Sequence, residues 1–148
     1  FSQTAWDELN VVMDAVREEI NITCTAFMND DKEAAQRVAP LGVVITRLCD
    51  ELKMRHAERL SQGKCGLEEG TVFSDILNSF CRIATHCASA MVALMKSGET
   101  GSDLHIHDSK IYPTNSVEYY QYFKEYGQKY DIVNQEGHML SMEPEEVE

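Results

Sequence analysis

The sequence predicts an all-α protein, an antiparallel bundle of three long helices followed by a fourth, aromatic helix. Two observations predict this class. Apolar residues recur at alternating spacings of three and four along most of the 148 residues, and no segment shows the period-two alternation that is typical of strands. Short breaks containing Gly, Asn or Asp separate the periodic segments, so consecutive helices are expected to be joined by short loops and to run antiparallel.

The first helix is expected over residues 2–27. Its apolar stripe follows spacings of 4, 3, 4, 4 and 3 through Leu9, Met13, Val16, Ile20, Cys24 and Phe27. The charged residues between these positions are assigned to the solvent face: Asp7, Glu8, Asp14, Arg17, Glu18 and Glu19. Residues 29–31 end this helix. Asp31 is expected to cap the next one, because a short carboxylate accepts hydrogen bonds from the free N–H groups of a first turn.

The second helix is expected to start near Asp31 and to kink or restart at Pro40, which has no N–H to donate. Residues 62–64 break it, and a third helix is expected to start near Leu67 or after Gly70. This third helix carries the most regular stripe of the chain, in Phe73, Ile76, Phe80, Ile83, Cys87, Ala90 and Leu94. Facing stripes predict a core that includes Leu48, Leu52, Phe73, Ile76, Phe80 and Ile83.

The chain is predicted to divide into four parts. Residues 1–97 form the three-helix bundle, residues 98–114 a connector rich in Gly, Ser, Thr, Asp and His, residues 115–132 a docking helix, and residues 133–148 an acidic, flexible tail. The docking helix is expected to hold its mainly aromatic side chains on one side, at Val117, Tyr120, Phe123, Tyr126 or Gly127, and Tyr130.

Composition excludes several classes of partner. The chain carries 25 acidic and 13 basic residues, a formal charge of −12 that repels nucleic acid and anionic lipid. No apolar stretch approaches the roughly 20 residues that a membrane-spanning helix needs, so we expect a soluble piece of a longer protein that does not itself insert into a membrane. Five cysteines without a C-x-x-C pair indicate a reducing compartment.

Specific motifs stand in the second and third helices: HAERLS at residues 56–61, FSDILN at 73–78 and RIATHC at 82–87. With the aromatic segment that begins at Glu118, they resemble the PhoU-like domain at the C-terminus of bacterial sodium/phosphate cotransporters, over residues 3–132. The resemblance implies a regulatory domain of phosphate uptake, without enzymatic activity or cofactor, on the cytoplasmic side of the inner membrane. It implies as partners the membrane-spanning half of the same transporter and other PhoU-like domains, including a second copy.

The sequence departs from this family where metal is concerned. PhoU domains carry acidic residues four apart on one helix face, where two carboxylates can converge on an iron or zinc cluster. Gly42 and Thr46 on the second helix, and Cys81 and Thr85 on the third, stand where those acids are expected. We therefore predict no metal cluster. The alternative is a metal-binding or catalytic helical bundle in which His and Cys replace the lost carboxylates.

The candidate functional residues form a polar ridge on the third helix. Asp75, Asn78, Arg82 and His86 follow spacings of 3, 4 and 4 and therefore share one face. This face is either simply solvated or a docking surface for another PhoU-like domain or the membrane half. His56 and Arg59 could join the ridge, or act as cations at the C-terminal end of their own helix.

A second candidate is the sequence His105-Ile106-His107-Asp108 in the connector, which carries potential metal ligands at alternate positions. A flexible connector does not hold ligands in a fixed geometry, so this reading is not favoured.

Overall fold

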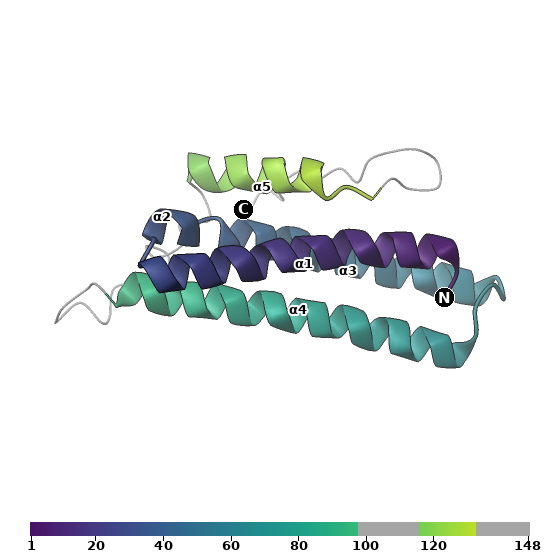
Figure 1. Ribbon diagram of the computed structural model, residues 1–148. Helices are drawn as coiled ribbons and strands as arrows, with labels where there is room; N and C mark the ends of the chain where they lie inside the picture. Colours follow the sequence, from purple (N-terminus) through teal and green to yellow (C-terminus); the bar gives the residue numbers. More distant parts are fainter. Residues whose placement is uncertain (98–115, 133–148) are drawn as a thin grey trace, which may run out of the picture.

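The computed structural model describes residues 1–97 and 116–132, and all regular structure in these two ranges is helical (Figure 1). Three long helices lie side by side: α1 (Gln3–Asn29), α3 (Val38–Ser61) and α4 (Leu67–Lys96). The short helix α2 (Lys32–Ala35) follows α1, and α5 (Val117–Lys129) packs on α3. The predicted all-α bundle is confirmed. The predicted connector at residues 98–114 and the tail at 133–148 lie outside the described residues.

The helix boundaries follow the local chemistry. The Ser2 hydroxyl accepts a hydrogen bond from the Ala5 N–H at the start of α1. The helix ends at Asn29, where Asp30 takes the left-handed conformation with φ of 52°. Asp31 then caps α2 by accepting from the Ala34 N–H at 2.9 Å, as predicted.

Pro40 lies in the first turn of α3. The first four N–H groups of any helix have no partner within it, so a proline there removes no hydrogen bond. The chain therefore restarts as a new helix before Pro40, which is the second of the two outcomes predicted at this residue. At the other end of α3, Gly63 adopts a φ of 67° and turns the chain towards α4, which begins at Leu67.

The core lies among α1, α3 and α4, and α5 adds to one side of it. Of the six predicted core residues, Leu48, Leu52 and Phe73 are fully buried. The other three are only partly buried, although they pack against the core: Ile76, Phe80 and Ile83. The side of α4 that faces the core most directly is a neighbouring one, which includes Leu77 and Met91.

The buried face of α1 was predicted correctly at Leu9 and Val16 and wrongly at the other four positions of the stripe. Met13, Ile20, Cys24 and Phe27 are exposed, and the face that meets the other helices is made largely of small residues. It consists of Ala5, Glu8, Leu9, Val12, Ala15, Val16, Glu19, Thr23 and Ala26. Both stripes have helical spacing, and the larger side chains drew the prediction to the outer one. Small residues let two helices approach closely. A prediction that favours the largest apolar side chains therefore misses a face made of small ones.

Helix α5 follows its prediction in its second half. Phe123, Tyr126 and Tyr130 are buried, whereas Val117 and Tyr120 are exposed. The docked face is held by cations of the bundle: the guanidinium of Arg47 lies 4.9 Å from the centre of the Phe123 ring. Lys129 pairs with Glu18 of α1 at 2.8 Å, and the Tyr130 hydroxyl donates to the same carboxylate.

Candidate functional site

The polar ridge on α4 is a line of four exposed side chains, Asp75, Asn78, Arg82 and His86. With 3.6 residues per turn, their spacing places them along one edge of the helix over about three turns. Within the part of the chain that the structure describes, none of the four side chains makes a hydrogen bond or an ion pair. The ridge therefore presents an acid, an amide, a guanidinium and an imidazole whose bonding capacity is free for a partner.

His56 and Arg59 do not belong to that exposed face, which corrects the prediction that they could join it. They are only 7% and 8% exposed. The His56 ring stacks on Phe73 with ring centres 4.9 Å apart, and its Nε2 lies 3.9 Å from the sulfur of Cys65. Burial, and then the nearby Arg59 cation, lower the pKa of His56, so the ring is a neutral packing element.

Arg59 instead belongs to a buried ion network around Glu8 of α1. The Glu8 carboxylate accepts from Arg59 at 2.8 Å and from Arg55 at 3.2 Å. Arg55 also donates to Glu51 at 2.7 Å and to the backbone carbonyl of Ile132 at 3.3 Å. This network joins α1, α3 and the residues that follow α5. Buried ion pairs of this kind fix the relative positions of elements more than they add net stability.

Glu19 is the second buried acid of α1, and it has no hydrogen-bond partner among the described residues. Its side chain is fully buried, and neither carboxyl oxygen forms a hydrogen bond with any described residue. Burial raises the pKa of Glu19 from 4.5 to about 8, because a charge is poorly solvated in the bundle interior. At neutral pH the group is therefore mostly a protonated, uncharged carboxylic acid.

The surroundings of Glu19 are built to accommodate its carboxyl group. A Cβ atom placed on Gly42 of α3 would lie 2.9 Å from Glu19 Oε1, so a larger residue there would require the end of the Glu19 side chain to shift. Cys87 of α4 lies close enough for a Glu19 charge to raise the pKa of the thiol, in addition to the larger effect of burial. Sequence analysis placed Glu19 on the solvent face. The sequence feature that could have indicated the burial of Glu19 is the glycine at position 42, inside the predicted helix that faces it.

The positions where the family pattern calls for metal-binding acids hold structural residues instead. The Thr46 hydroxyl donates to the Gly42 carbonyl, and the Thr85 hydroxyl to the Cys81 carbonyl, each at 2.9 Å. In residues 1–97 and 116–132 no three His, Cys, Asp or Glu side chains converge on a point that could hold a metal ion. These ranges thus give the metal-binding alternative no support. His105, His107 and Asp108 lie outside them.

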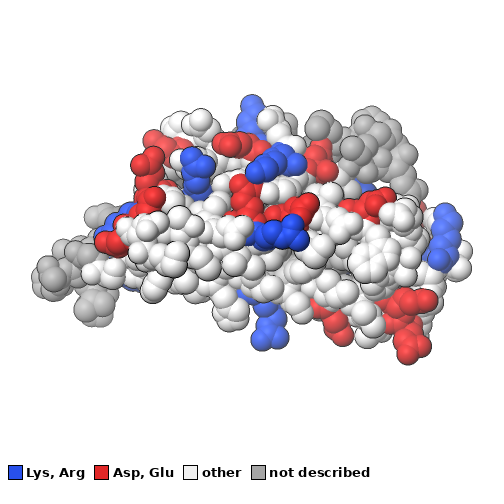
Figure 2. All heavy atoms as spheres, in the orientation of Figure 1, with Lys and Arg blue, Asp and Glu red and all other residues white. Residues whose placement is uncertain are grey.

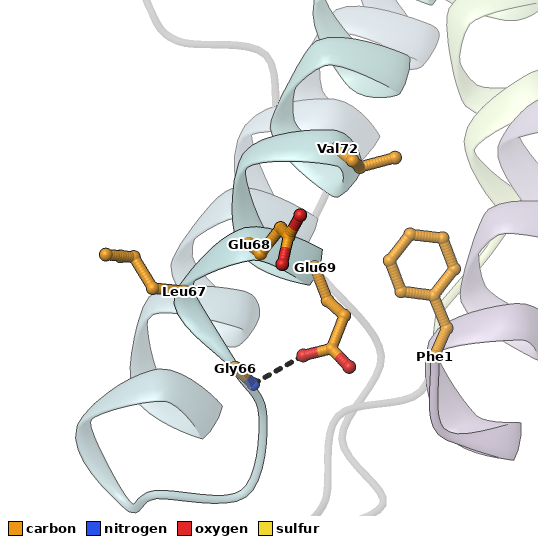
Figure 3. A pocket seen from close by; sticks show the side chains of 6 residues that line it. All are labelled: Phe1, Gly66, Leu67, Glu68, Glu69 and Val72. Carbon is orange, nitrogen blue, oxygen red and sulfur yellow. Dashed lines mark hydrogen bonds between the residues drawn. The ribbon is translucent and has the colours of Figure 1, made fainter.

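An open pocket of about 490 Å³ lies at one end of the bundle (Figure 3). Its lining combines two carboxylates with apolar side chains: Phe1, Gly66, Leu67, Glu68, Glu69 and Val72. One of these carboxylates, from Glu69, accepts the Gly66 N–H at 2.7 Å and so completes the N-terminus of α4. The carboxylates of Glu68 and Glu69 give the pocket a negative character that makes it unsuitable for phosphate.

Comparison with known proteins adds one match. A family model described as the PhoU domain matches residues 9–92, more than half of the chain. The matched span includes the polar ridge, Glu19 and Gly42, and it ends within α4. No curated protein and no solved structure matches the chain. None of the helices that the structure describes combines the length and the apolar character needed to cross a bilayer.

Proposed function

This chain belongs to the PhoU domain family, and from that premise we propose that it regulates sodium-dependent phosphate transport by protein contact. PhoU domains are regulatory domains of phosphate homeostasis and are not catalysts. The proposal adds the context: a cytoplasmic domain of a sodium/phosphate cotransporter, which contacts the membrane-spanning half of the same protein. The motifs at residues 56–61, 73–78 and 82–87 support this context.

The polar ridge carries the proposal. Oppositely charged side chains three or four positions apart on a helix surface can pair. Asp14 and Arg17 of α1 do so at 2.8 Å, as do Asp50 and Lys53 of α3 at 3.4 Å. The ridge side chains form no such pair within the described residues, because Asp75 and Arg82 are seven positions apart and neither has an opposite charge three or four positions away on α4. Unengaged opposite charges in a line suit a partner surface with complementary charges.

Regulation by contact also agrees with the interior of the bundle. The hydroxyls of Thr46 and Thr85 bond to carbonyls of their own helices rather than pointing ligand oxygens at a shared centre. The pocket beside Glu68 and Glu69 is acidic and does not suit phosphate. The described part of the domain thus offers surfaces for binding a protein more readily than it offers a site for binding phosphate.

The test is phosphate uptake by the full-length transporter that carries Asp75→Ala together with Arg82→Glu. If the ridge contacts the membrane half, uptake changes severalfold at equal membrane abundance, because one charge of the interface is removed and another is reversed. Thermal stability of the domain should change by less than about 0.5 kcal/mol, since both side chains face solvent.

Asp50→Ala together with Lys53→Glu provides the matched control. It makes the same change in net charge at a pair on the outside of α3, and it should leave uptake unaltered. Unchanged uptake in the ridge variant would mean that the ridge is an ordinary solvated face. A full-length gene product that lacks apolar segments of about 20 residues would remove the transporter context altogether.

A further inference from the structure

Helix α1 carries a row of exposed apolar side chains, of which Trp6 also packs edge-on against the Phe1 ring at 5.6 Å. Trp6, Met13, Ile20 and Phe27 are 49%, 36%, 38% and 61% exposed, and each follows the previous one by seven residues. Seven residues are close to two helical turns, so the four side chains lie along one face. We call these four residues the heptad stripe. Its side chains face away from α3 and α4, on which the small-residue face of α1 packs.

The positions between the members of the heptad stripe complete a pattern typical of paired helices. Asn10, Arg17 and Cys24 follow the first three members by four residues and are also exposed. The stripe and these residues thus alternate by four and three, which is the spacing of the contact positions in a pair of packed helices. We call the heptad stripe together with Asn10, Arg17 and Cys24 the seam. The only charged one, Arg17, is already paired with Asp14 at 2.8 Å. The seam therefore carries little net charge.

The surface over α1 differs from the rest of this acidic protein. Figure 2 shows mostly uncharged atoms where α1 crosses the front of Figure 1, with a small group of acidic and basic side chains near the middle. The stripe extends over 21 residues, about 31 Å along the helix and roughly 10 Å across. A largely apolar band of roughly 300 Å² is about the size of the largest apolar patch on a typical monomer, and such patches are often functional.

We propose that the heptad stripe is the contact between two copies of this chain, with α1 packed antiparallel against α1 of the other protomer. The stripe is symmetric about a point between Val16 and Arg17. A two-fold axis there pairs Trp6 with Phe27 and Met13 with Ile20 of the other protomer, so that aromatic meets aromatic and aliphatic meets aliphatic. An in-register parallel pair, in which each side chain meets its own copy, also matches all four by type, so another feature must distinguish the two arrangements.

Charge also favours the antiparallel arrangement. In a parallel pair Arg17 would face Arg17 of the other protomer, which is repulsive. In the antiparallel pair each Arg17 lies within about 3 Å, along the axis, of Asp14 of the other protomer. The two ion pairs then form one neutral group of four charges across the seam. A second copy thus fits both the apolar and the charged parts of the stripe.

The contact should be weak and should strengthen with salt. The stripe alone is smaller than the interface of a stable dimer, which predicts a dissociation constant in the micromolar range. Each chain carries a formal charge of −12, and this long-range repulsion is screened as ionic strength rises. Salt weakens an association held together by ion pairs, so a dissociation constant that falls with salt is specific to the apolar seam.

Sedimentation equilibrium of the chain and two glutamate variants tests the proposal. Ile20→Glu places a charge at the centre of the seam and should raise the dissociation constant at least tenfold. Met54→Glu is the control, since Met54 is an exposed apolar residue of α3 outside the stripe and its replacement should change nothing. Phe27→Ser provides a second seam variant, and circular dichroism confirms that each variant is folded. A chain that stays monomeric at several hundred micromolar, or an Ile20→Glu variant that dimerises like the parent, overturns the proposal.

Disulfide trapping tests the orientation. In the antiparallel pair Asn10 lies within about 1.5 Å, along the axis, of the exposed Cys24 of the other protomer, so Asn10→Cys should give a covalent dimer under mild oxidation and the parent should not. A parallel pair would bring Cys24 against Cys24 and cross-link the parent, which overturns the arrangement.

Binding of the monomer to phosphatidylcholine vesicles, lost in Ile20→Glu, would assign the stripe to a lipid surface instead. None of these readouts depends on the transporter context, so this inference can fail or hold independently of it.

Discussion

Glu19 should make the stability of the domain fall as pH rises through neutrality. In the unfolded chain its carboxyl loses a proton above about 4.5, whereas in the folded state burial holds the pKa at about 8. Between these two values the folded state binds one more proton than the unfolded state. The free energy of unfolding therefore decreases with pH in this window and levels off on either side of it.

The magnitude follows from the two pKa values. One proton of difference corresponds to about 1.4 kcal/mol per pH unit, so between pH 5 and pH 7.5 the folded state should lose roughly 3 kcal/mol of stability at this residue. That is a large share of the total stability of a small domain, which is commonly 5–15 kcal/mol. The cost is substantial because neither oxygen of Glu19 has a partner among the described residues.

Urea unfolding of the parent and of Glu19→Gln, followed by circular dichroism from pH 5 to pH 9, measures this effect. The amide cannot ionise, so the difference in unfolding free energy between the two proteins should grow in favour of Glu19→Gln by roughly 3 kcal/mol up to pH 7.5. Other titrating groups, including His56 with its lowered pKa, are common to both proteins and cancel in the difference. Glu33→Gln, at an exposed glutamate, should show no such trend. Parallel pH profiles for the parent and Glu19→Gln would refute the reasoning.

Two further predictions concern the interior contacts of α1. Glu8→Gln should lower the free energy of unfolding by about 3–5 kcal/mol in urea titrations, because it leaves the buried guanidiniums of Arg55 and Arg59 without their shared carboxylate. A loss below about 1 kcal/mol would show that the network is dispensable. Gly42→Ala should cost at most about 1 kcal/mol, since the new methyl group would lie 2.9 Å from Glu19 Oε1 and shift that buried side chain, which more than offsets the gain that alanine usually brings over glycine inside a helix. The cost of Gly42→Ala should largely disappear in a Glu19→Ala background, and an equal cost in both backgrounds would contradict the close contact.

The sequence predicted those features of the fold that depend on local chemistry. Asp31 as a helix cap, the restart before Pro40 and the turn at Gly63 each follow from the backbone preferences of one residue. The buried face of α1 could not be predicted in the same way. Ala15 and Ala26 are buried because α3 and α4 come close, and that closeness depends on residues such as Gly42 that are distant in the sequence.

The candidate site was predicted to a similar extent. Four polar residues three or four positions apart define the ridge, and the structure places all of them on the exterior. His56 and Arg59 have helical spacing too, but their burial is decided by Phe73 and by Glu8, which belong to other helices. Periodicity assigns a residue to a face of its own helix. It does not tell which face the neighbouring helices will cover.

The hydrogen bond from Arg55 to the carbonyl of Ile132 bears on how much of the chain is needed for a stable fold. The family match ends at residue 92, yet this bond joins α3 to a residue 77 positions later, and Ile132 is itself buried in the main core with Phe123 and Tyr126. A fragment cut after α4 would expose that apolar surface and would deprive Arg55 of an acceptor. A fragment that keeps this core and this hydrogen bond therefore has to extend to residue 132, well past the boundary that family similarity alone would suggest.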